Sequence, residues 1–128
     1  MLRKILAVDD SALIHQMYKL FLSRYKNCKL VSAMNGLEAL DKLAQEEGID
    51  LILLDIMLPD LDGYEIFQLI RKNPLWDDIK VICLTAKNRD VDVAKGLNLG
   101  VDAYITKPFS NADLLAKIRQ LLPERVAT

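Results

Sequence analysis

The sequence predicts an α/β fold, in which a doubly wound parallel sheet of five strands carries helices on both faces. An unbroken aliphatic run at residues 51–54 ends in Asp55. A run without polar alternation is typical of a strand buried on both faces, as in a parallel sheet covered by helices. Short apolar runs also alternate five times with segments of helical periodicity, which implies right-handed crossovers between parallel strands. The common strand order for such a sheet is 2-1-3-4-5.

Length and composition predict a single domain over residues 1–128. The chain is 52% hydrophobic and 27% charged, and its net charge of -1 does not favour nucleic acid or an anionic membrane as a partner. No stretch approaches the roughly 20 apolar residues that span a bilayer, so we expect a soluble cytoplasmic protein. Cys28 and Cys83 share no metal-type spacing and are expected to be reduced thiols, with Cys83 buried in a strand.

Two β/α units open the chain. Residues 4–8 predict the first strand, and apolar residues three and four positions apart predict a helix after it. Residues 30–33 predict a short second strand, and Asn35 begins a turn into a second helix that Gly48 ends. The apolar residues whose spacing predicts these helices are Leu13, Met17, Leu20 and Phe21 in the first, and Leu37, Leu40, Leu43 and Ala44 in the second.

The third unit follows the central strand, which is expected over residues 51–55. Residues 59–63 form a loop, and a helix then carries Ile66, Phe67 and Ile70 toward the core. The helix is expected to end at Asn73-Pro74, because proline disfavours a helical residue before it.

Two further units complete the expected sheet. Residues 80–84 predict the fourth strand, which ends at Thr85, and a weak helix follows through residues 91–99. It is weak because Gly96 lies inside it and costs about 1 kcal/mol relative to alanine. Residues 101–106 predict the fifth strand, and Asn111 is expected to cap the last helix. The last helix carries Leu114, Leu115, Ile118, Leu121 and Leu122, and Pro123 closes it.

Polar side chains stand where four of these strands end. Asp9 and Asp10 follow the first strand, Asp55 ends the third, and Thr85 and Lys107 end the fourth and fifth. The order 2-1-3-4-5 brings the three carboxylates into one pocket. At about 5 Å and an effective dielectric constant near 20, each pair of carboxylates repels by roughly 3 kcal/mol, so the cluster requires a cation or a proton. Mg²⁺, or Mn²⁺ in its place, suits an all-oxygen site beside a lysine and a hydroxyl.

The motifs resemble the receiver domain of bacterial two-component response regulators, single-domain chemotaxis regulators included, which has a flavodoxin-like fold. The resemblance runs from Ile5 to about Leu122. The segments that carry it are Val8-Asp9-Asp10-Ser11, Leu54-Asp55, Pro59-Asp60-Leu61-Asp62-Gly63, Leu84-Thr85-Ala86, Gly100-Val101-Asp102-Ala103-Tyr104 and Lys107-Pro108-Phe109.

The resemblance implies a phosphorylation site and a metal site. Asp55 would accept a phosphoryl group from a phosphohistidine on a sensor histidine kinase or a histidine phosphotransfer protein. Asp10 and Asp55 would bind Mg²⁺ directly with the backbone carbonyl of Met57, and Asp9 would act largely through a bound water. The protein would not be an enzyme acting on an outside substrate, although it would assist its own phosphorylation and dephosphorylation.

The resemblance also implies how the phosphoryl group is sensed. Thr85, Ala86 and Lys107 would contact it, and the peptide bond between Lys107 and Pro108 would be cis. Tyr104 would act as a switch aromatic on the face formed by the fourth helix, the fifth strand and the fifth helix. A downstream protein would bind to this face.

Two positions are expected to tune the lifetime of the phosphorylated state. By resemblance they are Met57, two residues after Asp55, and Lys87, two residues after Thr85. Hydrolysis needs a water held in line with the phosphorus. Apolar Met57 would cover the phosphoryl group without orienting water, and Lys87 would pair with its oxygens, so we expect slow hydrolysis.

Two other functions, phosphatase and flavin carrier, fit these motifs less well. An aspartyl-phosphate phosphatase would have a second aspartate two residues after the nucleophile, where this chain has Met57. A flavin-binding electron carrier would need a phosphate-binding loop after the first strand, and Asp9-Asp10 would repel that phosphate. Taken alone, Asp10 or Ser11 could simply cap a helix. His15, the only histidine, is expected to be exposed to solvent.

Overall fold

The structure is a computed structural model that describes residues 3–25, 27–86 and 99–122. Its five strands form one parallel sheet in the order β2-β1-β3-β4-β5, as the sequence predicts. The strands are β1 (Arg3–Val8), β2 (Cys28–Ala33), β3 (Ile49–Asp55), β4 (Lys80–Ala86) and β5 (Ala103–Lys107). The helices in the described residues are α1 (Ala12–Leu22), α2 (Gly36–Gln45), α3 (Gly63–Lys72), the 3-10 helix η1 (Pro74–Trp76) and α5 (Asn111–Leu121). The expected helix over 91–99 lies almost entirely outside the described residues.

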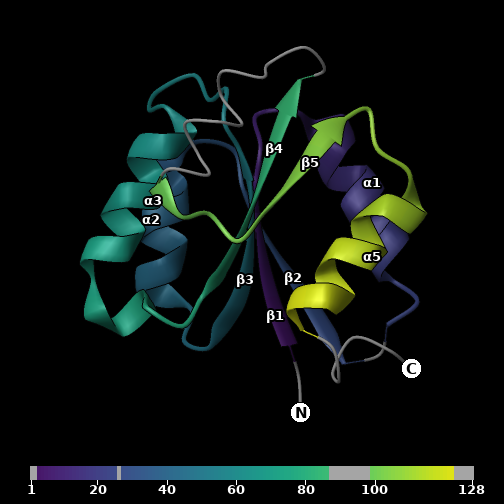
Figure 1. Cartoon of the computed structure of the whole chain (residues 1–128), viewed down its shortest axis with the longest axis horizontal. Helices are drawn as coiled ribbons and strands as arrows, with labels where there is room; N and C mark the ends of the chain where they lie inside the picture. Colours follow the sequence, from purple (N-terminus) through teal and green to yellow (C-terminus); the bar gives the residue numbers. More distant parts are fainter. Residues whose placement is uncertain (1–2, 26, 87–98, 123–128) are drawn as a thin grey trace.

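The sheet separates two layers of helices. In Figure 1, α2 and α3 cover one face, and α1 and α5 cover the other. The central strand β3 shows why the sequence has no polar alternation here. Ile52 and Leu54 pack among the residues on the α2 and α3 side, whereas Leu51 and Leu53 pack on the α1 and α5 side. All four are fully buried, and truncation of one such leucine to alanine typically costs about 2–5 kcal/mol.

The apolar spacing predicts α1 correctly, but the residues that carry it are not the buried ones. Leu13 and Leu20 are 65% and 69% exposed, and the buried residues of this helix are His15, Tyr18 and Leu22. Both sets of residues have helical spacing, so periodicity alone did not distinguish them. His15 was expected in solvent, but it is only 6% exposed because its ring contacts the backbone of Asp9.

The same holds in part for α2, and two smaller expectations need correction. In α2, Leu37 is 60% exposed and the buried residues include Ala39 and Leu43. This helix ends at Gln45, so Gly48 lies beyond its end, in the turn before β3, where its φ of 79° suits glycine. The last helix is capped by Ser110 and not by Asn111. Ser110 and Asp113 bond each other's backbone N–H groups in a capping box.

Cys83 is buried and Cys28 is partly exposed, and both are free thiols. None of the helices in the described ranges combines the length and the apolar character needed to cross a membrane.

Candidate functional site

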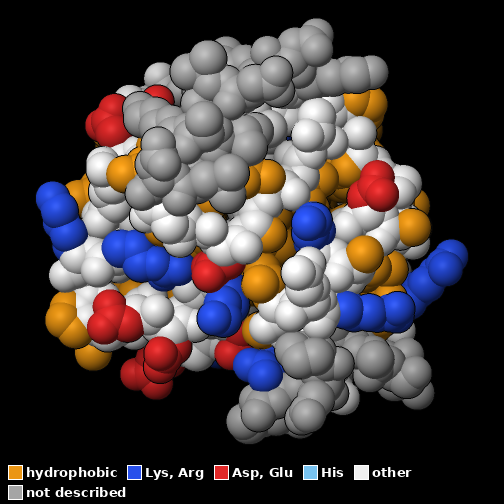
Figure 2. Space-filling view, in the orientation of Figure 1, with side chains coloured by type: hydrophobic (Ala, Val, Ile, Leu, Met, Phe, Trp, Pro, Cys, Tyr) orange, Lys and Arg blue, Asp and Glu red, His pale blue; other side chains and the backbone are white. Residues whose placement is uncertain are grey.

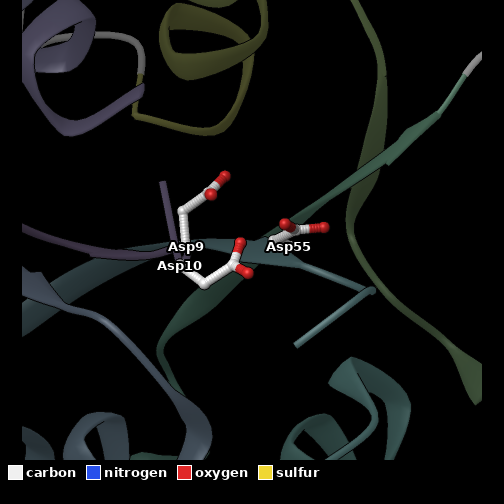
Figure 3. A group of neighbouring side chains, drawn as sticks. All are labelled: Asp9, Asp10 and Asp55. Carbon is white, nitrogen blue, oxygen red and sulfur yellow. The ribbon is translucent and has the colours of Figure 1, made fainter. Parts of the chain in front are cut away.

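The sheet brings three aspartates together at its carboxyl edge. β1 and β3 are neighbours, with Val8 paired to Leu54, so the residues that follow these strands meet. Ligand oxygens of Asp9, Asp10 and Asp55 lie within 4.8 Å of one another. In Figure 3 the Asp10 side chain extends toward Asp55, whereas the Asp9 carboxylate points away from Asp10.

Asp9 is the most firmly held of the three aspartates. It is 1% exposed, and its N–H donates to the Ala33 carbonyl at 3.1 Å. Its Oδ1 accepts from the Ser11 N–H at 2.9 Å, its Oδ2 accepts from Lys107 Nζ at 2.7 Å, and its carbonyl oxygen lies 2.8 Å from His15 Nε2. Every polar atom of Asp9 therefore has a partner, and its carboxylate has little freedom to move.

Asp55 and Asp10 are held less completely. Asp55 is 6% exposed, and its Oδ1 accepts from the Met57 N–H at 3.0 Å while its Oδ2 accepts from Lys107 Nζ at 3.2 Å. Burial raises the pKa of Asp55, although the Met57 N–H and the Lys107 charge partly oppose this change. Asp10 is exposed, and its carboxylate makes no hydrogen bond or ion pair with the described residues. Asp10 therefore presents a charge that the described residues do not balance.

Lys107 is the cation that reaches this cluster from β5. Its ammonium pairs with both Asp9 and Asp55. Desolvation opposes its charge, but the hydrogen bond to Asp9 and the charge of Asp55 outweigh it and raise the pKa of Lys107. Lys107 also acts to lower the pKa of Asp55, but desolvation by burial is the larger influence on that carboxyl and raises its pKa. One ammonium facing three carboxylates leaves the cluster short of positive charge, and hard oxygen donors at this spacing fit a divalent cation such as Mg²⁺.

Thr85 and Ala86 lie at the end of β4, next to the acids. Leu84 pairs with Asp55 across the sheet, so Thr85 and Ala86 are the next residues along. Thr85 is 3% exposed, and among the described residues its hydroxyl makes one contact, a long one of 3.4 Å with the Ala86 carbonyl. Such a contact is weak, so the hydroxyl is available to a closer acceptor.

Tyr104 lies on β5, beside Cys83 of β4. Its hydroxyl is 3.0 Å from the hydroxyl of Tyr64, which is 2% exposed at the start of α3. The sequence reasoning did not consider Tyr64. In the sequence, the position of Tyr64 directly after the motif at residues 59–63 is the feature that could have drawn attention to it.

Three other predicted positions have mixed outcomes. The peptide bond between Lys107 and Pro108 is cis. Met57 is 55% exposed beside Asp55, and only its backbone N–H contacts that carboxylate. Lys87 lies outside the described residues.

The acidic residues of the loop after β3 serve helix starts. Asp60 accepts hydrogen bonds from the N–H groups of Gly36 and Leu37 at the start of α2, and these bonds hold its pKa below the usual range. Asp62 caps α3 by accepting from the Tyr64 N–H at 2.7 Å. Neither residue belongs to the three-aspartate cluster.

The three-aspartate cluster lies at the carboxyl edge of the sheet, apart from two cavities that described residues line. The larger cavity, of about 670 Å³, lies at the opposite end, between the C-terminal part of α2 and η1. A second cavity, of about 390 Å³, lies between β5 and α5 and includes Tyr104 and Pro108 in its walls. Within the cluster Asp9 and Asp55 are buried and Asp10 is exposed, so a partner reaches the cluster from the side of Asp10.

The model of the response regulator receiver domain matches residues 5–119. The chain belongs to the response regulator receiver family. A curated relative, protein PilG of Pseudomonas aeruginosa, is 38% identical over 94% of this receiver and 87% of PilG.

Solved receiver structures agree with the fold. A CheY-like receiver domain protein from Methanospirillum hungatei is 35% identical and covers 98% of this chain and 97% of its own, with a TM-score of 0.86. The chemotaxis response regulator CheY4 of Vibrio cholerae is 29% identical and covers 94% of this chain and 99% of its own, with a TM-score of 0.85.

As a member of this family, the chain is a phosphoryl-accepting receiver of two-component signalling. Receivers bind Mg²⁺ at a group of aspartates, and Asp9, Asp10 and Asp55 form such a group in this chain. The family is not one of conventional enzymes.

Proposed function

We propose that Asp55 is the residue that accepts the phosphoryl group. The observation that carries this proposal is the difference between the three carboxylates. Asp9 has every polar atom engaged, and Asp10 is exposed with no partner in the described residues. Asp55 is buried and, like Asp9, accepts from an N–H group and from Lys107. Its contact with the ammonium is longer than that of Asp9, 3.2 Å against 2.7 Å, and it pairs across the sheet with Leu84, next to Thr85. A carboxylate that is desolvated and fixed in direction is suited to in-line attack on phosphorus.

The same difference suggests how Mg²⁺, or Mn²⁺, is shared among the acids. Mg²⁺ binds oxygen at about 2.0–2.1 Å, so two ligand oxygens on opposite sides of the ion are about 4.2 Å apart. One oxygen of each carboxylate lies within 4.8 Å of the others, so one ion can lie among the three with small movements of their side chains. We assign direct contacts to Asp10, Asp55 and the Met57 carbonyl, and a water-mediated contact to Asp9, whose oxygens are already occupied. When bound, the ion neutralises charge on the phosphoryl oxygens.

Protein groups near Asp55 supply the remaining contacts. Lys107 already reaches Asp55 Oδ2, and its ammonium is close enough to follow a phosphoryl group placed there. Thr85 has a weakly held hydroxyl and Ala86 has a backbone N–H at the same edge. Because phosphoryl transfer depends mainly on positioning and charge stabilisation, these groups and the metal allow the receiver to assist its own phosphorylation and dephosphorylation.

The proposed partners fit two different surfaces. A sensor histidine kinase or histidine phosphotransfer protein would approach the acid cluster from the side of Asp10. A downstream protein would bind the face formed by β5, α5 and the helix predicted over residues 91–99, and the cavity of about 390 Å³ lies beside Tyr104 of β5. Figure 2 shows the side nearest β5, where acidic and basic side chains are interspersed over the described residues. Such a mixed surface favours a protein partner over nucleic acid.

The proposed switch uses Tyr104. Phosphorylation adds about -1.5 to -2 charge, which would draw Thr85 toward the phosphoryl group and change the space beside Tyr104. Amide exchange with and without beryllofluoride should change in residues 86–108. Changes confined to α1 and α2 would contradict this switch. We propose that residues 1–128 act as one receiver domain in the cytoplasm, a compartment in which free cysteines such as Cys28 and Cys83 persist.

Labelling with acetyl phosphate tests the assignment of Asp55. The Asp55→Asn variant should take up no phosphoryl group, because an amide oxygen is a poor nucleophile. Asp62→Asn is the matched control, since it makes the same change in the same loop outside the cluster, and it should be labelled as the wild type is. Labelling in the wild type should also require Mg²⁺. Robust labelling of Asp55→Asn on any residue would contradict the proposal.

A further inference from the structure

His15 is a buried polar side chain whose hydrogen bond is directed at the backbone of the acid cluster. It lies on α1, and its Nε2 is 2.8 Å from the carbonyl oxygen of Asp9. A carbonyl oxygen only accepts hydrogen bonds, so Nε2 must carry the hydrogen and donate it. The other ring nitrogen, Nδ1, is buried with no hydrogen-bond partner among the described residues. The imidazole thus makes a single polar contact, to Asp9.

The carbonyl that His15 contacts belongs to the peptide unit between Asp9 and Asp10. Because a peptide unit is planar, the direction of its oxygen also fixes the position of the next nitrogen and Cα. The N–H and the carboxylate of Asp9 are held by other residues. The hydrogen bond from His15 therefore restrains the one remaining peptide plane, and with it the direction in which the Asp10 side chain leaves the backbone.

Asp10 depends on this restraint more than its neighbours do. Its carboxylate has no contact with the described residues, so only the backbone and the side-chain rotamer aim it toward Asp55. Asp9 and Asp55 are each held directly by Lys107. A small rotation of the peptide between Asp9 and Asp10 would move the Asp10 oxygens and leave the other two carboxylates in place.

Aromatic side chains hold the imidazole where it is. His15 meets Tyr18 edge to face, with ring centroids 6.4 Å apart and an interplanar angle of 80°. Tyr18 is 1% exposed and stacks on Phe109 at 5.9 Å. Phe109 lies two residues after Lys107, so one aromatic column supports both His15 and the segment that follows the lysine. His15 cannot turn away from Asp9 without disturbing this column.

We propose that His15 is a positioning residue for the metal site. Its Nε2–H holds the peptide between Asp9 and Asp10 so that the Asp10 carboxylate faces Asp55 at a separation that one divalent cation spans. His15 touches neither the metal nor the phosphoryl group, and it acts through the Asp9 backbone. The inference rests on the proposed role of the acid cluster in binding Mg²⁺.

The His15→Phe variant tests this role, because phenylalanine keeps a ring against Tyr18 and removes the donor. Mg²⁺ binding, measured by calorimetric titration, should weaken by about tenfold, the lower end of the range for residues that orient metal ligands. Labelling by acetyl phosphate should need correspondingly more Mg²⁺ and approach the wild-type rate at saturation. His15→Gln retains an N–H donor and should bind Mg²⁺ more tightly than His15→Phe. Gln16→Phe, at the exposed next position, is the matched control and should not change binding.

Three results separate the possible outcomes. Wild-type Mg²⁺ affinity in folded His15→Phe would overturn the proposal. If that variant does not fold, long-range proton-nitrogen spectra of the wild type at mildly alkaline pH show which ring nitrogen of His15 carries the proton. A proton on Nε2 supports the role. A proton on Nδ1 would leave no donor for the Asp9 carbonyl and would overturn the proposal. A wild-type protein that binds no Mg²⁺ would overturn the proposed function of the cluster itself, whatever His15 does.

Discussion

Acidic side chains are paired with cations differently at the two ends of the sheet. At the amino end, three carboxylates each have a cation of their own. The pairs are Arg3 with Asp50 at 2.8 Å, Lys4 with Glu46 at 3.4 Å, and Arg71 with Asp102 at 3.0 Å. At the carboxyl end, Asp9 and Asp55 share the ammonium of Lys107, and Asp10 has no ion-pair partner among the described residues.

The amino-end charges stabilise the fold, whereas the carboxyl-end charges are placed to bind a ligand. Asp102 also accepts from the Val81 N–H at the start of β4, and Asp50 accepts from the Lys4 N–H at the start of β1. These amino-end acids hold strands and helices in place and need nothing further. The three carboxyl-end acids have one cation, Lys107, among the described residues, and like charges this close are unfavourable until a further cation or a proton arrives. Paired substitutions at the two ends can test this contrast.

The largest expected effect is the loss of the shared lysine. Lys107→Met leaves the buried Asp9 carboxylate without its cation, which should reduce the free energy of unfolding in EDTA by about 3 kcal/mol. Mg²⁺ should restore part of this loss, because the ion replaces the missing positive charge. Arg71→Met is the amino-end counterpart, where a partly exposed pair is worth about 1 kcal/mol or less. Denaturant unfolding of the wild type and of both variants, with and without Mg²⁺, measures these changes in the free energy of unfolding. Arg71→Met keeps the acid cluster, so Mg²⁺ should stabilise it only as much as it stabilises the wild type. Restoration of the Arg71→Met loss by Mg²⁺ would contradict the contrast.

The second effect concerns the lifetime of the phosphorylated state. Met57→Asn combined with Lys87→Glu should orient water near the phosphorus and speed autodephosphorylation by about tenfold, equivalent to roughly 1.4 kcal/mol in the barrier. The same two replacements at the amino end, Leu75→Asn with Lys80→Glu, should leave the decay rate unchanged. Decay of the purified phosphoprotein gives the rate. An unchanged or slower rate in the first variant would show that water access does not limit hydrolysis here.

The third effect is a gain in stability from removing a carboxylate. Asp10→Asn should raise the free energy of unfolding in EDTA by about 1 kcal/mol, which corresponds to a rise of about 3–5 °C in Tm for a domain of this size. Asp50→Asn should lower it by a similar amount, because Asp50 loses its contacts with Arg3 and the Lys4 N–H. Thermal melting of both variants shows the signs directly. A lower Tm for Asp10→Asn would mean that the acids of the cluster are not crowded.

The smallest effect is a pH dependence of opposite sign at the two ends. Burial raises the pKa of Asp55, so its favourable contribution to folding is complete below the unfolded pKa of about 3.9 and is lost as pH rises through the folded pKa. The stabilisation by Asp55→Asn in EDTA should therefore grow from acid to neutral pH. Lys29 and Lys4 lower the pKa of Glu46, so Glu46→Gln should instead become destabilising over the same rise. Melting curves of both variants across this pH range give the change in Tm for each. A change of Tm with the same sign in both variants would contradict the contrast between the two ends.

Much of the fold was predictable because the strands leave a strong signal. The run at residues 51–54 is apolar because both its faces are buried, and each polar residue at a strand end marks where the sheet meets solvent. The strand order and the meeting of Asp9, Asp10 and Asp55 follow from those two facts. Their chemical roles came from the family resemblance, because position alone does not say which carboxylate attacks phosphorus.

The helix faces were harder to predict, for a physical reason. In α1, Leu13 and Leu20 are apolar but exposed, and the buried position 15 holds a polar residue. The burial of His15 is acceptable only because the Asp9 carbonyl accepts its hydrogen bond, and that partner becomes available only when β1 and α1 are in place. The start of α5 was misplaced by one residue because Ser110 and Asn111 are both good caps, and the Asp113 side chain decides between them.

Gly63 sets a limit on how this sequence can vary. Its N–H donates to the Ile56 carbonyl at 2.9 Å, and a Cβ at position 63 would lie 2.6 Å from the Asp55 carbonyl oxygen and from the Ile56 Cα. Backbone atoms cannot yield as a flexible side chain can, so α3 can begin against Asp55 only if the residue has no side chain. Gly48 and Gly100 have open space around them and are constrained only by their positive φ. Among variants selected for folding, asparagine should therefore replace glycine at positions 48 and 100, and glycine alone should survive at position 63.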